Sequence, residues 1–452
     1  MAQTQKEAID LLVTGGQVVT MDDHWTVIEN GGVAIRQEII LEVGPQKQLF
    51  DKYAPKEIIG SSDQVVFPGL VNAHTHAATA LFRGFADDRP LKQWLEGFIW
   101  PAEATFITPE TVYWGTLLAA CEMVRAGVVA FLDMYFYEEV VARAAKETGI
   151  RAVLGEAVFD SAGPNKLSFD QGLDYTRKLL ENFRNDPLVT VSVQPHGTHT
   201  VSARNLMRAK ALADEFGVVF ALHASETAQE VNEVQGKTGF TPVRLLKHHG
   251  LLGDKVALFH GVHLDDEEIS VLAETKTAIV HCPESNLKLA SGIARLPDLL
   301  KAGVPVGLGT DGPASNNDFD LWTEIQFATK IHRGVSHDPL AISDKQALYI
   351  ATRGGANALG LGESIGSLQP GKRADLILID FNQPHLVPMY DVYSHLAFAV
   401  GRADVNTTIV NGVLVMRDRQ VLSVDETQVM DQVRKIGREI GKWLVHQRVL
   451  YN

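Results

Sequence analysis

Two histidines separated by one residue, His74 and His76, follow an apolar run that includes Val65, Phe67 and Val71. Side chains two positions apart on a β-strand point to the same side, so both imidazoles can reach one metal ion from a single strand end. The same spacing also occurs at strand ends that bind nothing. The pair therefore defines only half of a candidate metal site.

Four further strand-like segments each end in a residue that can bind a metal or move protons. They are 189–195 before His196, 218–222 before His223, 256–259 before His260, and 305–310 before Asp311. Imidazole nitrogens and a carboxylate oxygen suit zinc, and a catalytic zinc site keeps one coordination position open for water. We therefore expect one zinc ion with His74, His76, His223 and Asp311 as its ligands.

A zinc ion with such ligands has a defined chemistry. It lowers the pKa of a bound water towards ~7 and so supplies hydroxide at neutral pH. If the target is an amine-bearing ring carbon, the adjacent ring nitrogen must gain a proton and the amine must leave as ammonia. Glu226, three residues after His223, is placed for that proton transfer. Asp311 can also accept the water proton, and His260 can stabilise the oxygen on the tetrahedral carbon.

Both of these assignments have a structural alternative. Glu226 could be a carboxylate at a helix start, where the helix dipole favours it. His260 could be a core histidine. We expect His263 and His281 either to have structural roles or to contact the residues that bind the metal or the substrate.

The central region alternates between strand-like and helical segments, and eight strand candidates lie in it. They are 67–74, 128–134, 151–159, 189–196, 218–225, 256–263, 277–283 and 305–311. Helices are expected between them, including 108–125, which opens Thr-Pro-Glu, and 202–216, which opens with a capping serine. Eight such units in about 300 residues predict a (β/α)8 barrel, whose active site gathers at the C-terminal ends of the strands.

Both ends of the chain have a different pattern. Short β-branched runs broken by turn residues fill 9–66, as in a small antiparallel sheet, and short strands return at 374–379, 407–415 and 420–423. Apolar residues at spacings of three and four predict an amphipathic last helix: Val429, Val433, Ile436, Ile440 and Leu444. We predict an α/β protein in which a TIM barrel, 67–366, is inserted in a small β-sandwich domain built from 1–66 and 367–452.

Composition agrees with a globular enzyme. The chain has 452 residues, of which 45% are hydrophobic, and its net charge of −14 is spread without a basic stripe. This argues against nucleic acid and anionic membranes as partners. No signal region or membrane span is apparent, so we expect a cytoplasmic protein. Cys121 and Cys282 form no paired motif and are expected to be buried free thiols.

Several longer motifs resemble a known family. Residues 68–76, Pro-Gly-Leu-Val-Asn-Ala-His-Thr-His, resemble the first-strand signature of the amidohydrolase superfamily. Within it the chain resembles the 5′-methylthioadenosine/S-adenosylhomocysteine deaminases, on blocks that run through nearly the whole barrel. These blocks are 82–88, 99–103, 133–137, 281–289, 309–317 and 371–376.

The resemblance implies residue roles as well. It gives Glu226, His260 and Asp311 the catalytic roles described above, and it matches Trp94 and Glu103 to residues that handle the nucleoside. A carboxylate can accept both hydrogens of a ribose diol, and an aromatic ring can cover the sugar or the 5′ substituent. Further matches are His196 to a histidine that binds a purine nitrogen and Ser315 to a residue facing the substrate. Without the resemblance, Trp94 would be assigned to ordinary packing.

The chain also departs from the pattern of that family. The usual Pro-His-Ala-Pro-Tyr is replaced by Pro-His-Gly-Thr-His at 195–199, and Gly-Glu-Ala stands at 155–157 where some members carry an arginine suited to a charged 5′ tail. Two-metal members use a carboxylated lysine at the end of the fourth strand, and 189–200 contains none, so the resemblance implies a single metal.

These observations predict a zinc-dependent deaminase of 5′-modified adenosines: 5′-methylthioadenosine, S-adenosylhomocysteine or adenosine. The alternatives are an amidohydrolase acting on another amino- or chloro-substituted ring, such as guanine or a triazine, and a non-catalytic barrel that binds a nucleoside or metal. Homo-oligomers are possible, with Trp100 or Tyr113 as candidates for an interface.

Overall fold

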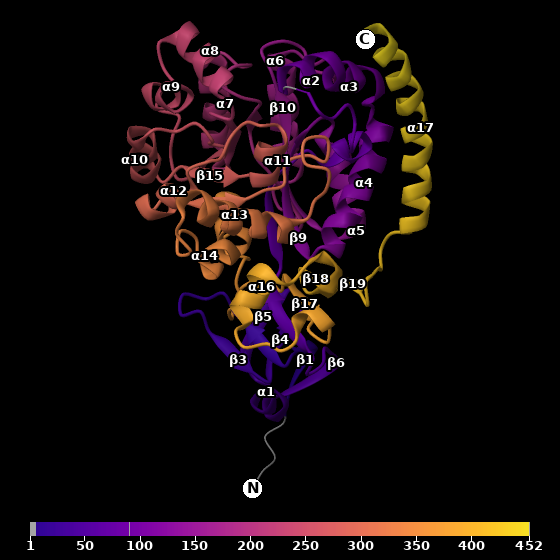
Figure 1. The fold of residues 1–452 in the computed structure, drawn as a ribbon. Coiled ribbons are helices and arrows are strands. Elements are labelled where there is room, and N and C mark those ends of the chain that lie inside the picture. Colours follow the sequence, from indigo (N-terminus) through magenta and orange to yellow (C-terminus); the bar gives the residue numbers. More distant parts are fainter. Residues whose placement is uncertain (1–5, 90, 452) are drawn as a thin grey trace.

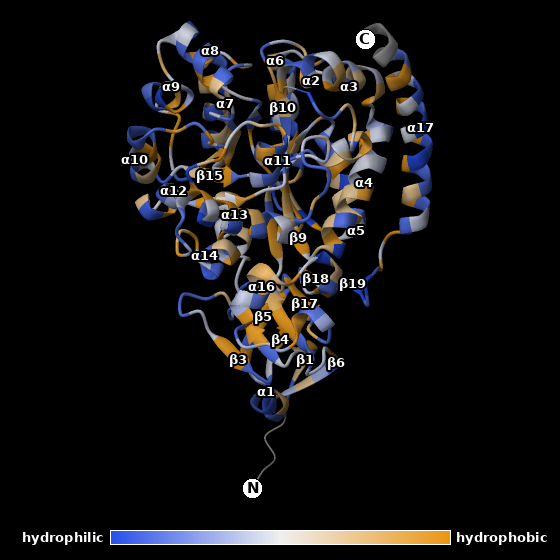
Figure 2. Ribbon diagram, in the orientation of Figure 1, coloured by the Kyte–Doolittle hydropathy of each residue, from blue (hydrophilic) through white to orange (hydrophobic). Residues whose placement is uncertain are grey.

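The computed structural model describes residues 6–89 and 91–451. Figure 1 shows a larger α/β body and, below it, a smaller body made mostly of strands. Strands from the N-terminal and C-terminal parts of the chain pair in the smaller body. Figure 2 shows hydrophobic residues concentrated on the inner strands and hydrophilic residues on the outer helices.

The smaller body contains two sheets. The four-stranded sheet has the order β5-β4-β1-β6, with β1 Glu7–Thr14, β4 Gly31–Arg36, β5 Ile39–Pro45 and β6 Tyr53–Ile59. The seven-stranded sheet has the order β20-β19-β18-β17-β7-β2-β3. Its strands are β2 Gln17–Val19, β3 Val27–Glu29, β7 Gln64–Pro68, β17 Leu376–Asp380, β18 Val405–Val410, β19 Val413–Arg417 and β20 Gln420–Val421.

The prediction of an antiparallel sheet is only partly right, because β1 pairs with β6 and β2 with β7 in parallel. The parallel β1–β6 connection passes through four intervening strands, β2 to β5, and helix α1, Gln46–Lys52, which turn patterns alone do not reveal. The two chain ends pair directly, since β17 lies antiparallel to β7. Side chains of both sheets, among them Val13, Ile35, Val66 and Leu376, pack into one buried cluster.

The larger body holds two runs of parallel strands. One has the order β11-β10-β9-β8, with β12 also paired to β10, and the other has the order β13-β14-β15-β16. The strands are β8 Leu70–Thr75, β9 Val128–Tyr135, β10 Arg151–Val158, β11 Val189–Val191, β12 Gln194–Pro195, β13 Phe220–Ala224, β14 Val256–His260, β15 Ala278–His281 and β16 Val306–Leu308.

All eight predicted strands are present, but two are divided. The segment 189–196 forms β11 and β12, and 67–74 is split at Gly69 between β7 of the smaller body and β8 of the larger one. A Cβ on Gly69 would lie 2.1 Å from Cγ1 of Val129, so only glycine lets the chain pass from one sheet to the other here.

Helices cover the outside of the parallel strands. The predicted helix at 108–125 is α4, Pro109–Arg125, and the Thr108 side chain caps it by accepting from the Thr111 backbone N–H. The helix predicted at 202–216 is α7, Ala203–Phe216, but Ser202 makes no side-chain capping bond. The prediction of a capping serine was therefore wrong; the Ser202 backbone N–H bonds to Asp160 Oδ2 at 3.0 Å instead, which fixes the helix entry from a neighbouring loop.

The remaining helices complete the chain order. Those of the larger body are η1 Ala77–Phe82, α2 Leu91–Trp94, η2 Leu95–Ile99, α3 Trp100–Phe106, α5 Glu138–Thr148, α6 Phe169–Asn182, α8 Ala228–Thr238, α9 Pro242–His248, α10 Asp266–Thr275, α11 Pro283–Lys288, α12 Leu296–Ala302, α13 Leu321–Ser336, α14 Asp344–Tyr349, η3 Ile350–Gly354 and α15 Gly355–Ala358. Later in the chain come η4 Pro384–Leu386, α16 Val392–Phe398 and η5 Arg402–Asp404.

The last helix, α17 Glu426–Tyr451, runs along the outside of the larger body beside α4 (Figure 1, yellow). Val429 packs with Leu117 and Ala144. Further along, Trp443 stacks on Phe85 at a centroid distance of 6.2 Å. The predicted apolar face of the helix thus packs on a helix of the α/β body.

The structure also bears on the two cysteines and on membrane-spanning helices. Cys121 and Cys282 are buried free thiols, as predicted. Among the described residues, no helix combines the length and the apolarity that a membrane crossing needs.

Candidate active site

The predicted site residues lie at the C-terminal ends of the parallel strands. His74 is in β8, His223 in β13 and His260 is the last residue of β14, whereas Asp311 follows β16. His260 and Asp311 have φ angles of 72° and 61°, and Ser225 after β13 has 57°. Residues other than glycine rarely adopt this left-handed backbone, which costs of order 1–3 kcal/mol and clusters at functional sites.

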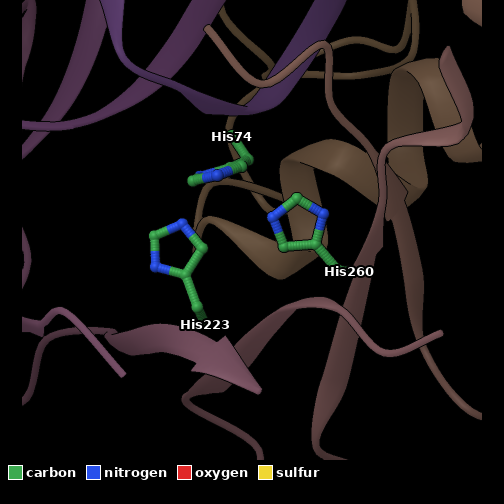
Figure 3. A group of neighbouring side chains, drawn as sticks. All are labelled: His74, His223 and His260. Carbon is green, nitrogen blue, oxygen red and sulfur yellow. The ribbon is translucent and has the colours of Figure 1, made fainter. Parts of the chain in front are cut away.

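Four histidines and one carboxylate surround a common point. His74 Nε2 and His76 Nε2 lie 3.5 and 3.2 Å from Asp311 Oδ1. The ring of His74 lies 5.0 Å from that of His223 and 5.5 Å from that of His260, between centroids. Figure 3 shows the rings of His74, His223 and His260 turned towards one another.

The orientation of three of these rings is fixed from behind. The Nδ1 atoms of His76, His223 and His260 lie 2.6 Å from the Met134 carbonyl, 2.7 Å from the His196 carbonyl and 2.9 Å from Asn286 Oδ1. Because these oxygens can only accept, Nδ1 carries the hydrogen in each ring. Nε2 of a neutral ring is then left with a free lone pair, which is the arrangement typical of metal-binding histidines.

The residues present fit a metal ion. Ligand atoms of His74, His76 and Asp311 lie within 4.8 Å of one another, as do those of His74, His223 and His260. His74 is fully buried, and neither of its ring nitrogens has a hydrogen-bond partner among the described residues. A buried polar atom without a partner is costly, and a metal ion would satisfy it. Imidazoles with one carboxylate are a zinc-type donor set.

Electrostatics separate the two histidines of β8. Burial lowers the pKa of His74 to about 3, so this ring is neutral. Burial would also lower the pKa of His76, but its contact with Asp311 raises it to about 9. Although burial alone would raise the pKa of Asp311, His74 and His76 hold it well below its usual range. Metal binding must therefore displace a proton from His76.

Glu226 faces the same centre. Its Oε2 lies 3.9 Å from His260 Nε2. Burial raises the pKa of the Glu226 carboxyl, which suits a group that must both donate and accept a proton near neutral pH. The sequence placed Glu226 and His260 on different strands, and the fold brings their reactive atoms together.

The five predicted substrate residues line a single cavity that opens from the histidine cluster. They are Trp94, Glu103, His196, Glu226 and Ser315. The empty space of the cavity, together with the open solvent at its mouth, is about 940 Å³. Aromatic and aliphatic side chains form much of its wall, among them Leu95, Trp100, Phe136 and Phe159. Such a pocket, apolar with a few convergent polar groups, is typical of small-molecule sites.

Glu103 is held at one end of this cavity. Its Oε1 accepts a hydrogen bond from the Tyr135 hydroxyl at 2.7 Å, and burial raises the pKa of Glu103 to about 7. Trp94 is buried, and its Nε1 donates to the Phe85 carbonyl at 3.1 Å. This bond fixes the plane of the indole ring in the cavity wall.

His196 and Ser315 both line the cavity. The His196 ring stacks on Phe159 at 4.5 Å between centroids, and its Nδ1 lies 2.9 Å from Thr200 Oγ1. The Ser315 hydroxyl donates to Asp311 Oδ2 at 2.6 Å. Ser315 thus contacts the carboxylate directly, as well as lining the cavity.

Several residues of the site were not predicted. Ser285 donates to Asp311 Oδ2 at 2.7 Å, Asn286 orients His260, and Tyr135 orients Glu103. Glu230 bonds to the backbone of Glu226. Ser285, Asn286 and Tyr135 lie in motifs quoted for the resemblance, but nothing in their spacing reveals which side chain each one contacts.

The weaker predictions have separate outcomes. His263 Nε2 lies 2.7 Å from the Ser291 carbonyl, which is a structural role as expected. His281 is buried beside His332, outside the cavity lining. Trp100 is 39% exposed and lines the cavity mouth, whereas Tyr113 is partly buried beneath α17.

A model of the amidohydrolase family matches residues 65–415. The chain belongs to the amidohydrolase family. This span contains every residue of the site described above.

This amidohydrolase has curated and structurally known relatives. It is 44% identical to a 5-methylthioadenosine/S-adenosylhomocysteine deaminase of Syntrophus aciditrophicus (strain SB), over 97% of this chain and 99% of that protein. It is similar to an adenosine deaminase of Xanthomonas campestris solved with bound zinc, with a TM-score of 0.95 and 37% identity over 97% and 100% of the two chains.

A more distant neighbour shares the fold. An atrazine chlorohydrolase of Arthrobacter aurescens TC1, complexed with zinc, superposes with a TM-score of 0.88 at 22% identity, over 94% of this chain and 100% of that one.

Proposed function

We propose that this amidohydrolase is a zinc-dependent hydrolase that deaminates 5′-modified adenosines, such as 5′-methylthioadenosine and S-adenosylhomocysteine, to the inosine analogue and ammonia. One observation carries the proposal: a metal-type cluster with Glu226 beside it opens into the cavity that also holds Glu103. The names of the relatives point to the same chemistry.

We assign His74, His76, His223 and Asp311 as the ligands of one zinc ion. His260 lies as close to His74 and His223 as a ligand would, but its approach to Glu226 suits it better to contacting the substrate. When bound, zinc acts as a Lewis acid and lowers the pKa of water to about 7.

The protein groups supply the proton transfers. In the reaction, a water oxygen bonds to the amine-bearing ring carbon and the carbon–nitrogen bond breaks. Glu226 gives a proton to the adjacent ring nitrogen, and His260, with a hydrogen on Nε2 as well as on Nδ1, donates a hydrogen bond to the new oxygen. Asp311 accepts a proton from the attacking water and passes it to the amine, which leaves as ammonia, and the hydroxyl proton of the tetrahedral carbon restores Glu226. Ser285 and Ser315 hold the second oxygen of Asp311, so its free oxygen stays directed at the centre.

In this proposal the side chains of the cavity wall select the substrate. Glu103 is placed to accept hydrogen bonds from the ribose diol, with Trp94 beside it to cover the sugar or the 5′ group, and His196 to meet a purine nitrogen. Among the described residues that line this cavity there is no arginine. We therefore expect 5′-methylthioadenosine to be preferred over S-adenosylhomocysteine, whose tail carries a carboxylate.

The finer description of the fold belongs to the same proposal. We propose that the two parallel runs close into one (β/α)8 barrel over 67–366. A parallel bridge joins Val193 to Phe220 on one side. On the other, the Thr310 backbone N–H donates to Asn72 Oδ1 at 3.0 Å. The two sheets of the smaller body would form the sandwich. Oligomeric state and cytoplasmic location stay predictions.

The test is ammonia release, with the absorbance shift from adenine to hypoxanthine, on 5′-methylthioadenosine, S-adenosylhomocysteine, adenosine and guanine. We expect turnover of the adenosines that is lost on chelation and restored by zinc. Turnover of guanine alone would refute the assignment to adenosines.

A further inference from the structure

Glu230 occupies a position that usually serves the helix itself. It is the third residue of α8, after the N-cap Thr227, whose side chain accepts from the Glu230 backbone N–H at 3.0 Å. A glutamate at this position commonly completes a capping box by bonding back to the N-cap backbone N–H. Glu268 of α10 does so, by accepting from the Asp265 backbone N–H at 3.0 Å.

The Glu230 side chain reaches past its own helix. Its Oε2 accepts from the Glu226 backbone N–H at 2.7 Å, and its Oε1 accepts from the Ser225 backbone N–H and the Thr198 hydroxyl, both at 3.2 Å. Burial would raise the pKa of Glu230, but its contacts with His199 and these N–H groups lower it, so the carboxylate is charged. Hydrogen bonds to a charged acceptor are about twice as strong as neutral ones.

The contacts of Glu230 come from two strand ends. Ser225 and Glu226 follow β13, and Thr198 and His199 follow β12. His199 Nδ1 lies 3.8 Å from Glu230 Oε1, and the His199 ring lines both the inner cavity and a second cavity outside it. One buried carboxylate therefore ties the segment that carries Glu226 to the wall between the two cavities.

The backbone at this point needs such support. Ser225 has a left-handed φ of 57°, which a serine adopts only where its surroundings impose it. The Glu226 side chain begins one residue later, so a small rotation there would move its carboxyl away from His260. A displacement of about 1 Å in a reacting group can cost ~100-fold in rate.

We propose that Glu230 is the positioning residue for the carboxyl of Glu226: it acts through the backbone of residues 225–226, although its own side chain also lines the cavity. The inference rests on the proposed function, because Glu226 is taken as the group that transfers the proton. Replacing Glu230 would then slow the chemical step and leave substrate binding nearly unchanged.

The first test compares Glu230→Gln with Glu268→Gln in zinc-loaded protein. Both are buried glutamates at the third position of a helix, and only Glu230 contacts the site. We expect Glu230→Gln to lower kcat at least about tenfold, a typical loss for a residue supporting a catalytic group, with KM changed by less than about threefold and zinc retained. Glu268→Gln should keep kcat within about twofold and lower only Tm.

A second test does not depend on activity. Hydrogen–deuterium exchange of peptides covering 222–231 should be faster in Glu230→Gln than in the wild type, and unchanged in Glu268→Gln. Thr198→Val, which removes one donor to Oε1 without loss of volume, should lower kcat about two- to fivefold, and the loss should vanish in the Glu230→Gln background. If Glu230→Gln does not fold, kcat and the exchange of 222–231 in Thr198→Val alone decide the matter: a lower kcat with faster exchange supports the inference, and wild-type values of both overturn it.

Three results would overturn the inference: normal kcat and exchange with a lower Tm only, loss of zinc from Glu230→Gln, or independent effects of Thr198→Val and Glu230→Gln. Failure of the proposed function is a separate outcome, since the wild type itself would then release no ammonia while the exchange experiment would still report on Glu230.

Discussion

Replacing Glu103 by glutamine should selectively remove recognition of the ribose diol. Glu103 is 6% exposed, and one of its oxygens is occupied by the Tyr135 hydroxyl at 2.7 Å. The carboxylate can accept from both sugar hydroxyls, whereas the amide has one acceptor oxygen, which Tyr135 competes for. One charge-assisted hydrogen bond is therefore lost, at about 1.5–3 kcal/mol. This corresponds to a decrease in kcat/KM of roughly 10- to 150-fold.

The assay compares an adenosine substrate with its 2′-deoxy analogue in wild type and Glu103→Gln. The deoxy analogue has already lost one of the two hydroxyls, so its kcat/KM should fall by no more than about tenfold in the variant. The ratio of the two substrates should therefore move towards one. An equal decrease for both substrates would show that Glu103 supports the cavity without contacting the diol, and would refute the assignment.

Three other predictions follow from buried contacts. Asn286→Leu removes the acceptor that fixes the His260 ring, so kcat should fall about 10- to 100-fold while the zinc content stays unchanged. Single-turnover kinetics would measure the rate of the chemical step. An unchanged kcat would mean that the His260 ring does not need this hydrogen bond for its orientation. Arg151 Nε lies 2.8 Å from Asp375 Oδ2, so Arg151→Met leaves Asp375 as a buried charge without a counter-charge between the two bodies. The substitution should lower the free energy of unfolding, measured by denaturant titration, by about 3–5 kcal/mol. A loss below about 1 kcal/mol would contradict this prediction. Burial raises the pKa of Glu156 to about 7, so the contribution of this carboxyl to stability is present below pH 4.5 and is lost as the pH rises to 7. The Tm of Glu156→Gln should therefore rise relative to the Tm of the wild type between pH 5 and 7.5. A difference in Tm that stays constant over this range would contradict the prediction.

The positions of the candidate ligands could be predicted because the order of strands and helices largely determines where they lie. Once 67–311 is divided into alternating strands and helices, every strand end faces the same side, and residues such as His74 and Asp311 must meet although they are far apart in sequence. The prediction needs only the order of the strands. The structure agrees for His223 and His260 as well.

The supporting residues could not be predicted in the same way. Tyr135 contacts Glu103, 32 positions earlier, and Asn286 contacts His260, 26 positions earlier. Such pairs depend on the loop paths and rotamers beyond the ends of the parallel strands, for which the spacing of residues carries no signal. Glu230 had a partial signal in its place at the start of α8, but that position predicts a capping box, which the structure does not contain.

The strand boundary at Gly69 shows a second limit. The segment 67–74 is predicted as one strand, but it crosses from one sheet to another. Periodicity reports burial and cannot tell which sheet buries a residue. The contact between Gly69 and Val129 that requires the glycine is visible only in the structure.

The central claim is that a metal-dependent deamination passes its proton through Glu226. Its most direct test is ammonia release from 5′-methylthioadenosine by zinc-loaded wild type and Glu226→Gln, each with its zinc content measured. We predict turnover by the wild type and a decrease of at least about 100-fold in the variant, with one zinc per chain in both. A variant that retains more than a tenth of the wild-type rate would contradict the account.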